Sequence, residues 1–160
     1  MKRSFYCISC CAAILAFAGC HSTSEEKASS TQAAPSIGQI SNDDITVVRA
    51  VGNNVGERIL TALQKNDYSL VKDLPVGDGK VVFTQEKFDE LYKKVQSQGG
   101  IGSFTYLGDL NMRPYHRMLW KVSFNDDPAK QNGNGVDVLF EVVMVKLNDS
   151  YRAAGFAFRQ

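Results

Sequence analysis

Apolar residues recur every three or four positions between Asn42 and Leu63, which is the spacing of one face of a helix. Two glycines, Gly52 and Gly56, interrupt this face, and each costs about 1 kcal/mol relative to alanine in a helix interior. Asn54 with Glu57 three residues later has the form of a capping box. We therefore expect two helical pieces, the main one beginning near Val55. The apolar face consists of Ile45, Val48, Val51 or Val55, Ile59, Leu60 and Leu63.

Two shorter helical patterns follow. Tyr68, Val71 and Leu74 form a second apolar face, which Pro75 ends. The glycines of "VGDGK" predict a turn, and Thr84 then caps a helix over "QEKFDELYKKVQSQ". One face of this helix is apolar, and Gly99 with Gly100 ends it. Its apolar positions are Phe88, Leu91, Tyr92 and Val95.

The chain after Gly100 has the texture of β-strands. Four segments are rich in β-branched and aromatic residues and are separated by turn-forming residues: "SFTYLGDL", "YHRMLWKVSF", "VDVLFEVVMVKL" and "YRAAGFAFR". The connection "LNDSY" is tight, so the last two strands should pair antiparallel, whereas "NDDPAKQNGNG" is a longer polar loop. Helices followed by strands predict an α+β domain, with N-terminal helices packed on an antiparallel sheet of four or more strands.

The second strand alternates cleanly between two faces. One face is apolar apart from its first residue and consists of His116, Met118, Trp120, Val122 and Phe124. The other carries Tyr115, Arg117, Lys121 and Ser123. Because alternate residues of a strand point to opposite sides of a sheet, the face with Trp120 is predicted to be the core face.

All four cysteines lie in the first twenty residues, in "CISCCAAILAFAGC". Lys2 and Arg3 precede a short apolar run, as in an export signal. The run falls short of the roughly 20 residues that a membrane-spanning helix needs. The residues Phe17-Ala18-Gly19-Cys20 resemble the lipobox of bacterial lipoproteins, although Phe17 replaces the usual leucine. The resemblance implies that Cys20 is acylated and becomes the mature N-terminus.

A zinc or disulfide site is the alternative interpretation, since "CISCC" contains a C-x-x-C. We favour the signal peptide, because a metal site needs a polar, folded setting and these cysteines lie in an apolar leader. Cys7, Cys10 and Cys11 would then be removed with residues 1–19. The mature chain would keep one acylated cysteine, and we expect neither a disulfide nor a metal or other cofactor.

Removal of the leader changes the charge balance. Loss of Lys2 and Arg3 leaves 16 of the 18 Lys and Arg residues against 17 Asp and Glu, a formal charge of −1. No basic stripe remains to hold nucleic acid or an anionic membrane face. The remaining length suits one domain.

Polar and small residues dominate the stretch after Cys20. We interpret residues 20–41 as the lipidated cysteine and a solvated tether, and residues 42–160 as one folded domain. His21 is expected to be exposed to solvent. In enterobacterial lipoproteins an Asp after the cysteine marks retention in the inner membrane, and His21 is not Asp. The expected location is thus the cell envelope, at the outer membrane if the source has two membranes.

The order of elements resembles the nuclear-transport-factor-2-like (NTF2-like), or cystatin-like, superfamily. The segments "ILTALQKNDYSLVKDL" and "TQEKFDELYKKVQSQGGIGSFTYLG" are similar to small secreted domains of unknown function in that superfamily, over roughly Ile45 to Arg159. The resemblance implies a cone-like fold, with the helices in the concavity of a strongly curved sheet. No catalytic motif of the superfamily aligns with this chain.

Two kinds of function are compatible with these patterns. The favoured one is a non-catalytic domain that binds a protein or a small molecule, since no nucleophile, base and orienting group come together in the sequence. The alternative is a small enzyme of the isomerase or dehydratase kind, which would use an ionisable group in the cone. The ionisable residues on or beside strands are His116, Asp109, Asp137 and Glu141. We expect Glu141 to be exposed on an edge or on the convex face.

A pocket in the cone, if one opens, should lie where the second strand begins. His116, Tyr115, Tyr92 and Trp120 would then line it. We expect His116 to be structural instead, with one ring nitrogen bonded to a backbone carbonyl. The opposite sheet face offers an apolar patch through which two copies could form a homodimer: Leu119, Leu139, Val143 and Val145.

Overall fold

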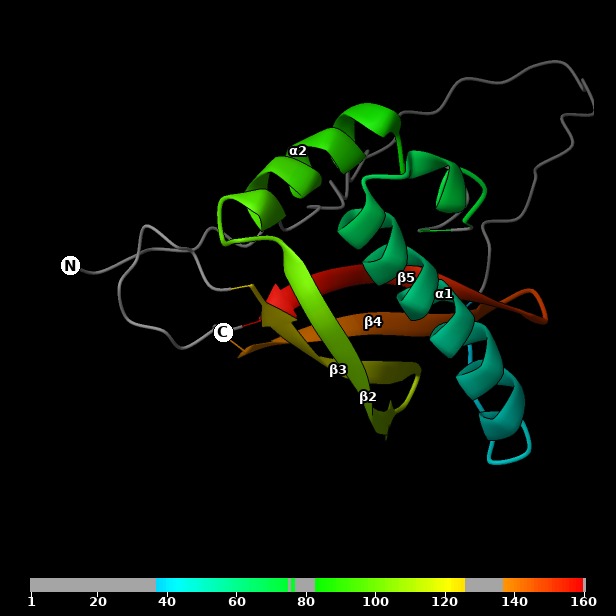
Figure 1. Ribbon diagram of the computed structural model, residues 1–160. Coiled ribbons are helices and arrows are strands. Elements are labelled where there is room, and N and C mark those ends of the chain that lie inside the picture. Colours follow the sequence, from blue (N-terminus) through cyan, green and yellow to red (C-terminus); the bar gives the residue numbers. More distant parts are fainter. Residues whose placement is uncertain (1–36, 75, 77–82, 126–136, 160) are drawn as a thin grey trace, which may run out of the picture. The chain divides into compact units, whose positions relative to one another are not determined.

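The computed structural model describes residues 37–74, 76, 83–125 and 137–159. In chain order the elements are β1 (Ile37–Gly38), α1 (Ile45–Lys65), the 3-10 helix η1 (Tyr68–Leu70), α2 (Gln85–Gln96), β2 (Ile101–Met112), β3 (Tyr115–Phe124), β4 (Asp137–Leu147) and β5 (Ser150–Arg159) (Figure 1). The predictions for the leader, Cys20, His21 and the turn at residues 77–80 lie outside the described residues.

The strands form one antiparallel sheet of five strands, in the order β2-β3-β4-β5, with β1 also paired to β4. The helices and this curved sheet confirm the predicted α+β class. Figure 1 shows α1 crossing the strands. The last two strands pair antiparallel through Leu147 and Ser150, as the short connection predicts.

The folded domain begins before the expected boundary at Asn42. Ile37 pairs with Leu147 and Gly38 with Lys146, and Ile40 is fully buried. Leu147 also pairs with Ser150 of β5, which occupies one edge of β4. Strand β1 therefore pairs with the other edge, the same edge that pairs with β3 up to Met144. Residues 37–41 thus belong to the fold and not to the tether.

Helix α1 is one continuous helix, so the expected break near Val55 was wrong. Its glycines allow the helix to lie close to the sheet. A Cβ at Gly52 would stand 2.7 Å from Cγ of Met118, and one at Gly56 would overlap the ring of Trp120. The contact with β3 therefore offsets the low helix propensity of glycine.

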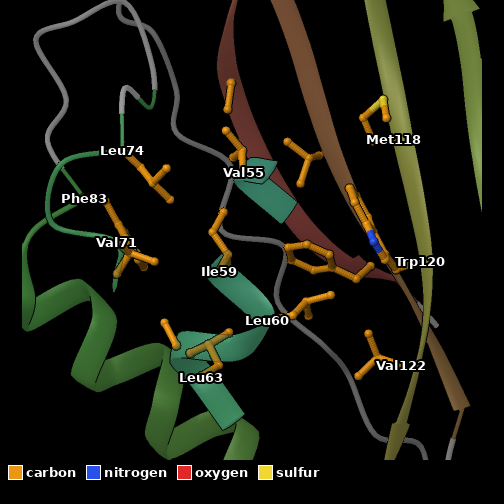
Figure 2. Close-up of a cluster of buried hydrophobic side chains, with 14 of the residues drawn as sticks. Val55, Ile59, Leu60, Leu63, Val71, Leu74, Phe83, Met118, Trp120 and Val122 are labelled. Carbon is orange, nitrogen blue, oxygen red and sulfur yellow. The ribbon is translucent and has the colours of Figure 1, made fainter. Parts of the chain in front are cut away.

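The core lies between α1 and the sheet face that carries Trp120. His116, Met118, Trp120, Val122 and Phe124 are all buried, which confirms the predicted core face of β3. Figure 2 shows side chains of α1 facing the strand that carries Met118, Trp120 and Val122. The ring of Trp120 also packs against Phe140 of β4, with centroids 5.7 Å apart.

The segment between α1 and α2 is less helical than expected. Of its described residues, only Tyr68–Leu70 form a helix, of the 3-10 type, although Val71 and Leu74 are buried as a helical face would require. Helix α2 begins as predicted, with Thr84 Oγ1 accepting a hydrogen bond from the Lys87 amide. Gly99 and Gly100 follow its end with φ of 108° and 77°, in the left-handed region that favours glycine.

Candidate functional site

A β-bulge in β2 determines which face of the sheet Asp109 joins. Tyr106 pairs with Trp120 on the core face, but the next pair is Gly108 with Leu119, so Leu107 is the extra residue. Gly108 has φ 138°, which suits glycine. Without the bulge Asp109 would share the outer face with Leu107. With it, Asp109 pairs with Met118 and reaches the core face.

There Asp109 joins three polar side chains from three elements. Its Oδ2 lies 2.7 Å from Nε2 of His116 on β3. Its Oδ1 accepts hydrogen bonds from Nε of Arg49 on α1 at 2.7 Å and from the Tyr106 hydroxyl at 3.1 Å. The Arg49 side chain is half exposed, that of Asp109 is largely buried, and that of His116 is fully buried. The four residues form a polar chain that runs from the surface into the core.

These contacts determine the charge of Asp109. Burial alone would raise its pKa, but hydrogen bonds from Arg49, Tyr106 and His116 together hold the pKa below its usual value of 3.8. Burial, with the neighbouring carboxylate, raises the pKa of Tyr106 to about 12. Asp109 is therefore ionised and Tyr106 neutral near pH 7. Because an ionised carboxylate only accepts hydrogen bonds, Nε2 of His116 donates to it.

His116 is enclosed on all sides. Its Nε2 is bonded to Asp109, and its Nδ1 is buried without a partner among the described side chains. The expected bond to a backbone carbonyl is replaced by the bond to this carboxylate. Farther along the same row, Trp120 lies against Gly56 of α1. Nearer to the imidazole, Met118 lies against Gly52 of the same helix and is also fully buried.

The other three residues predicted to line a pocket lie in three different places. Trp120 shares the core face with His116 and is 1% exposed. Tyr115 projects from the opposite face of β3, beside Met112, and is 40% exposed. Tyr92 belongs to α2, where its ring stacks on that of Phe88 at 6.4 Å. The core face of β3 thus brings together His116 and Trp120, but not the two tyrosines.

Glu141 is buried on the outer face of the sheet, so the expectation of an exposed carboxylate was wrong. Its side chain is 6% exposed. Its Oε1 accepts from Nη2 of Arg159 at 2.6 Å, and its Oε2 from Nη1 of Arg117 at 3.3 Å. Two arginines from the neighbouring strands therefore cover and neutralise it. Asp137, at the start of β4, is exposed and accepts a hydrogen bond from Ser123 at 2.6 Å.

A second polar cluster joins the beginning of α1 to the hairpin of β4 and β5. Asp44 Oδ2 accepts from the Ser41 amide at 2.9 Å and lies 3.3 Å from Nζ of Lys146. Hydrogen bonds from Tyr151 and Ser41 hold the pKa of Asp44 well below its usual range. This cluster attaches the segment before α1 to the β4–β5 hairpin, and we assign it a structural role.

The four residues predicted to form an apolar patch for self-association lie on the outer face of the sheet, but they are less exposed than expected. Val145 is buried, whereas Leu119, Leu139 and Val143 are half-buried. Leu107 at the bulge is 59% exposed, and four further exposed apolar residues of this face lie together at one end of it: Leu110, Met112 and Tyr115, with Ile37 of β1.

Sequence reasoning named Asp109 and His116 but did not join them, and it missed Arg49 and Tyr106. The signal was Gly108, because an isolated glycine within a strand pattern often marks a bulge. In the described part of the chain no group of three His, Cys, Asp or Glu side chains is placed to hold a metal. None of the helices described has the length and apolarity needed to cross a membrane.

Comparison with known proteins yields little. No family model and no curated protein matches the chain. Among solved structures, the chain is similar to a designed NTF2-like protein, Rd1NTF2_05 carrying five substitutions. The TM-score is 0.42 and the identity 19%, over 74% of this chain and 99% of the other. At this TM-score we build nothing on the likeness, and the fold class rests on the strand pairing and helix packing described above.

Proposed function

We propose that this chain is a lipid-anchored protein of the cell envelope whose α+β domain binds a partner at its surface and performs no catalysis. The anchor is acylated Cys20, and the domain is of the NTF2-like kind. The partner is a protein or a small molecule, and two copies associating through the outer sheet face are one form of such binding. If the source has two membranes, the protein resides at the outer one.

The anchor is supported by sequence alone. Lys2 and Arg3, the short apolar run and the small residues before Cys20 form the order of features that an export signal with a lipobox requires. The tether that follows would hold the domain within reach of the membrane.

Burial of His116 is the main observation in support of a domain without catalytic activity. A general base must come within about 3 Å of the proton that it removes. Both nitrogens of His116 are enclosed, one by Asp109 and the other within the core. The His116–Asp109 pair therefore stabilises the join between β2, β3 and α1.

An enzyme is the second candidate, and the same pair favours it. A histidine oriented by a carboxylate has the arrangement of a general base. For the pair to act, the interior near Met118 and Trp120 would have to open to admit a substrate.

Replacement of His116 by glutamine separates the two candidates. We expect His116→Gln to lower the free energy of unfolding by about 0.5–3 kcal/mol, the usual range for a buried site, and to leave partner binding by the folded protein intact. Denaturant unfolding measures the first effect. A stable variant that has lost turnover of an enolisable carbonyl compound, seen with the wild type, would overturn the proposal in favour of an enzyme.

A further inference from the structure

One end of the outer sheet face concentrates exposed apolar side chains. Leu110 and Met112 lie near the end of β2, and Met112 pairs with Tyr115, the first residue of β3. Their exposed fractions are 51%, 49% and 40%. All three point away from the core face. His116 points into the core, so its neighbours Tyr115 and Arg117 point to the outer face. Met112 pairs with Tyr115 and Leu110 pairs with Arg117, so both share that face.

Strand β1 continues the same patch. Ile37 pairs with Leu147, two residues beyond Val145 on the same side of β4, and Ile37 is 52% exposed. The β3–β4 pairing ends nearby, at His116 with Met144. Ile37, Leu110, Met112 and Tyr115, which we call the end patch, therefore share one face and one end of the sheet.

The chain enters the domain at this end. Residues 21–36 connect Cys20 to Ile37, a member of the end patch. The turn between β2 and β3 is tied to the same entry segment, because Arg113 Nη2 donates to the Asn42 side chain at 3.4 Å. A tether of this length and composition reaches roughly 20–24 Å on average, so an anchor at Cys20 holds the end patch close to the bilayer surface.

We propose that the end patch rests in the interfacial layer of the membrane that holds Cys20. This inference depends on the anchor in the proposed function. Leucine, methionine and isoleucine supply apolar area, and Tyr115 has the amphipathic ring that is enriched at membrane–water interfaces. The guanidinium of Arg113, at the tip between Met112 and Tyr115, suits the phosphate groups of lipids.

The contact is expected to be weak without the anchor. A few half-exposed side chains add little affinity for a free domain, and the mature chain has no basic stripe to assist them. An anchor changes this, because a short tether converts binding to an intramolecular event with an effective concentration in the millimolar range. The anchor then sets the distance of the domain from the bilayer, and the end patch sets its orientation.

The test couples the mature chain, residues 20–160, through the thiol of Cys20 to a maleimide lipid in phosphatidylethanolamine–phosphatidylglycerol vesicles. Cys20 is the single cysteine of that chain, and coupling supplies the anchor whether or not the cell acylates it. Hydrogen exchange is then measured for residues 110–116, on vesicles and in solution. A double variant, Met112→Ser with Tyr115→Ser, removes the centre of the patch. Val47→Ser is the matched control, because Val47 is 50% exposed but lies on α1, which packs on the opposite face.

We expect exchange in residues 110–116 to slow by about fivefold or more on vesicles in the wild type and in Val47→Ser, and not in the double variant. Unchanged exchange on vesicles, or equal slowing in the double variant, would overturn the inference. Slowing that grows with protein concentration in solution, without vesicles, would also overturn it and would assign the patch to a second copy. None of these outcomes bears on whether Cys20 is acylated in the cell, which is measured separately.

Discussion

Nε2 of His116 lies 2.7 Å from Oδ2 of Asp109, and the imidazole that it belongs to is fully buried. The bond links β3 to β2, and Arg49 of α1 holds the other oxygen of the same carboxylate. Two consecutive strands and a helix that precedes them by a long stretch of chain thus meet at one ionised group. Substitutions that remove or misplace this carboxylate should weaken the fold.

Asp109→Asn tests the carboxylate directly. Because the folded state lowers the pKa of Asp109, its stabilising effect is present above pH 4 and is lost as the pH falls through the lowered pKa. We expect the variant to be less stable at pH 7 by about 1–3 kcal/mol, and the difference from the wild type to shrink as the pH falls below about 4. Urea unfolding at several pH values measures both effects. Asp137→Asn, at an exposed pair, should cost much less.

Gly108→Ala tests the bulge. The φ of 138° is one that L residues rarely adopt, and no atom lies within 4 Å of a Cβ built there. The expected loss of about 1–3 kcal/mol therefore comes from backbone strain and from poorer placement of Asp109. Because misplacement of Asp109 would already be part of the loss in Gly108→Ala, the double variant with Asp109→Asn should lose less stability than the sum of the two single variants. Full additivity would show that the bulge does not serve Asp109.

Gly56→Ala tests the close approach of α1 to the sheet. In an open helix this change would stabilise, but here the new methyl group overlaps Trp120. We expect a loss of about 1–3 kcal/mol from overpacking, measured by thermal unfolding. Gly155→Ala on β5, where nothing lies within 4 Å of the new Cβ, is the control and should change stability little. A gain in stability in Gly56→Ala would contradict the observed packing.

Two deletions locate the true start of the domain. Removal of residues 21–33 from the mature chain should change the free energy of unfolding by less than about 0.5 kcal/mol, because their polar composition predicts a segment with no packed contacts to lose. Removal of residues 21–40 also takes away β1 and the buried Ile40 and should cost about 2–5 kcal/mol. Equal effects of the two deletions would argue against the pairing of β1 with β4.

The sequence predicts the strands and the core face well, because burial of one sheet face imposes a period of two that β3 displays without interruption. It does not predict β1, since a two-residue strand has no period to read. It also misjudges α1: the glycines that suggest a break by propensity are required by Met118 and Trp120, which are neighbours only in the folded chain. The same holds for Asp109, because alternation through Tyr106 assigns it to the wrong face and only the bulge corrects this. Glu141 is buried by arginines that pairing of the strands supplies.

The anchor at Cys20 is the claim on which the proposed function depends most. Intact-mass spectrometry of the protein from the membrane fraction tests it most directly. We predict a chain that begins at Cys20 and carries a diacyl or triacyl adduct on that residue, and we predict that Cys20→Ser leaves the chain unprocessed or soluble. A mature N-terminus at any other residue, or an unmodified Cys20 in the membrane fraction, would contradict the account.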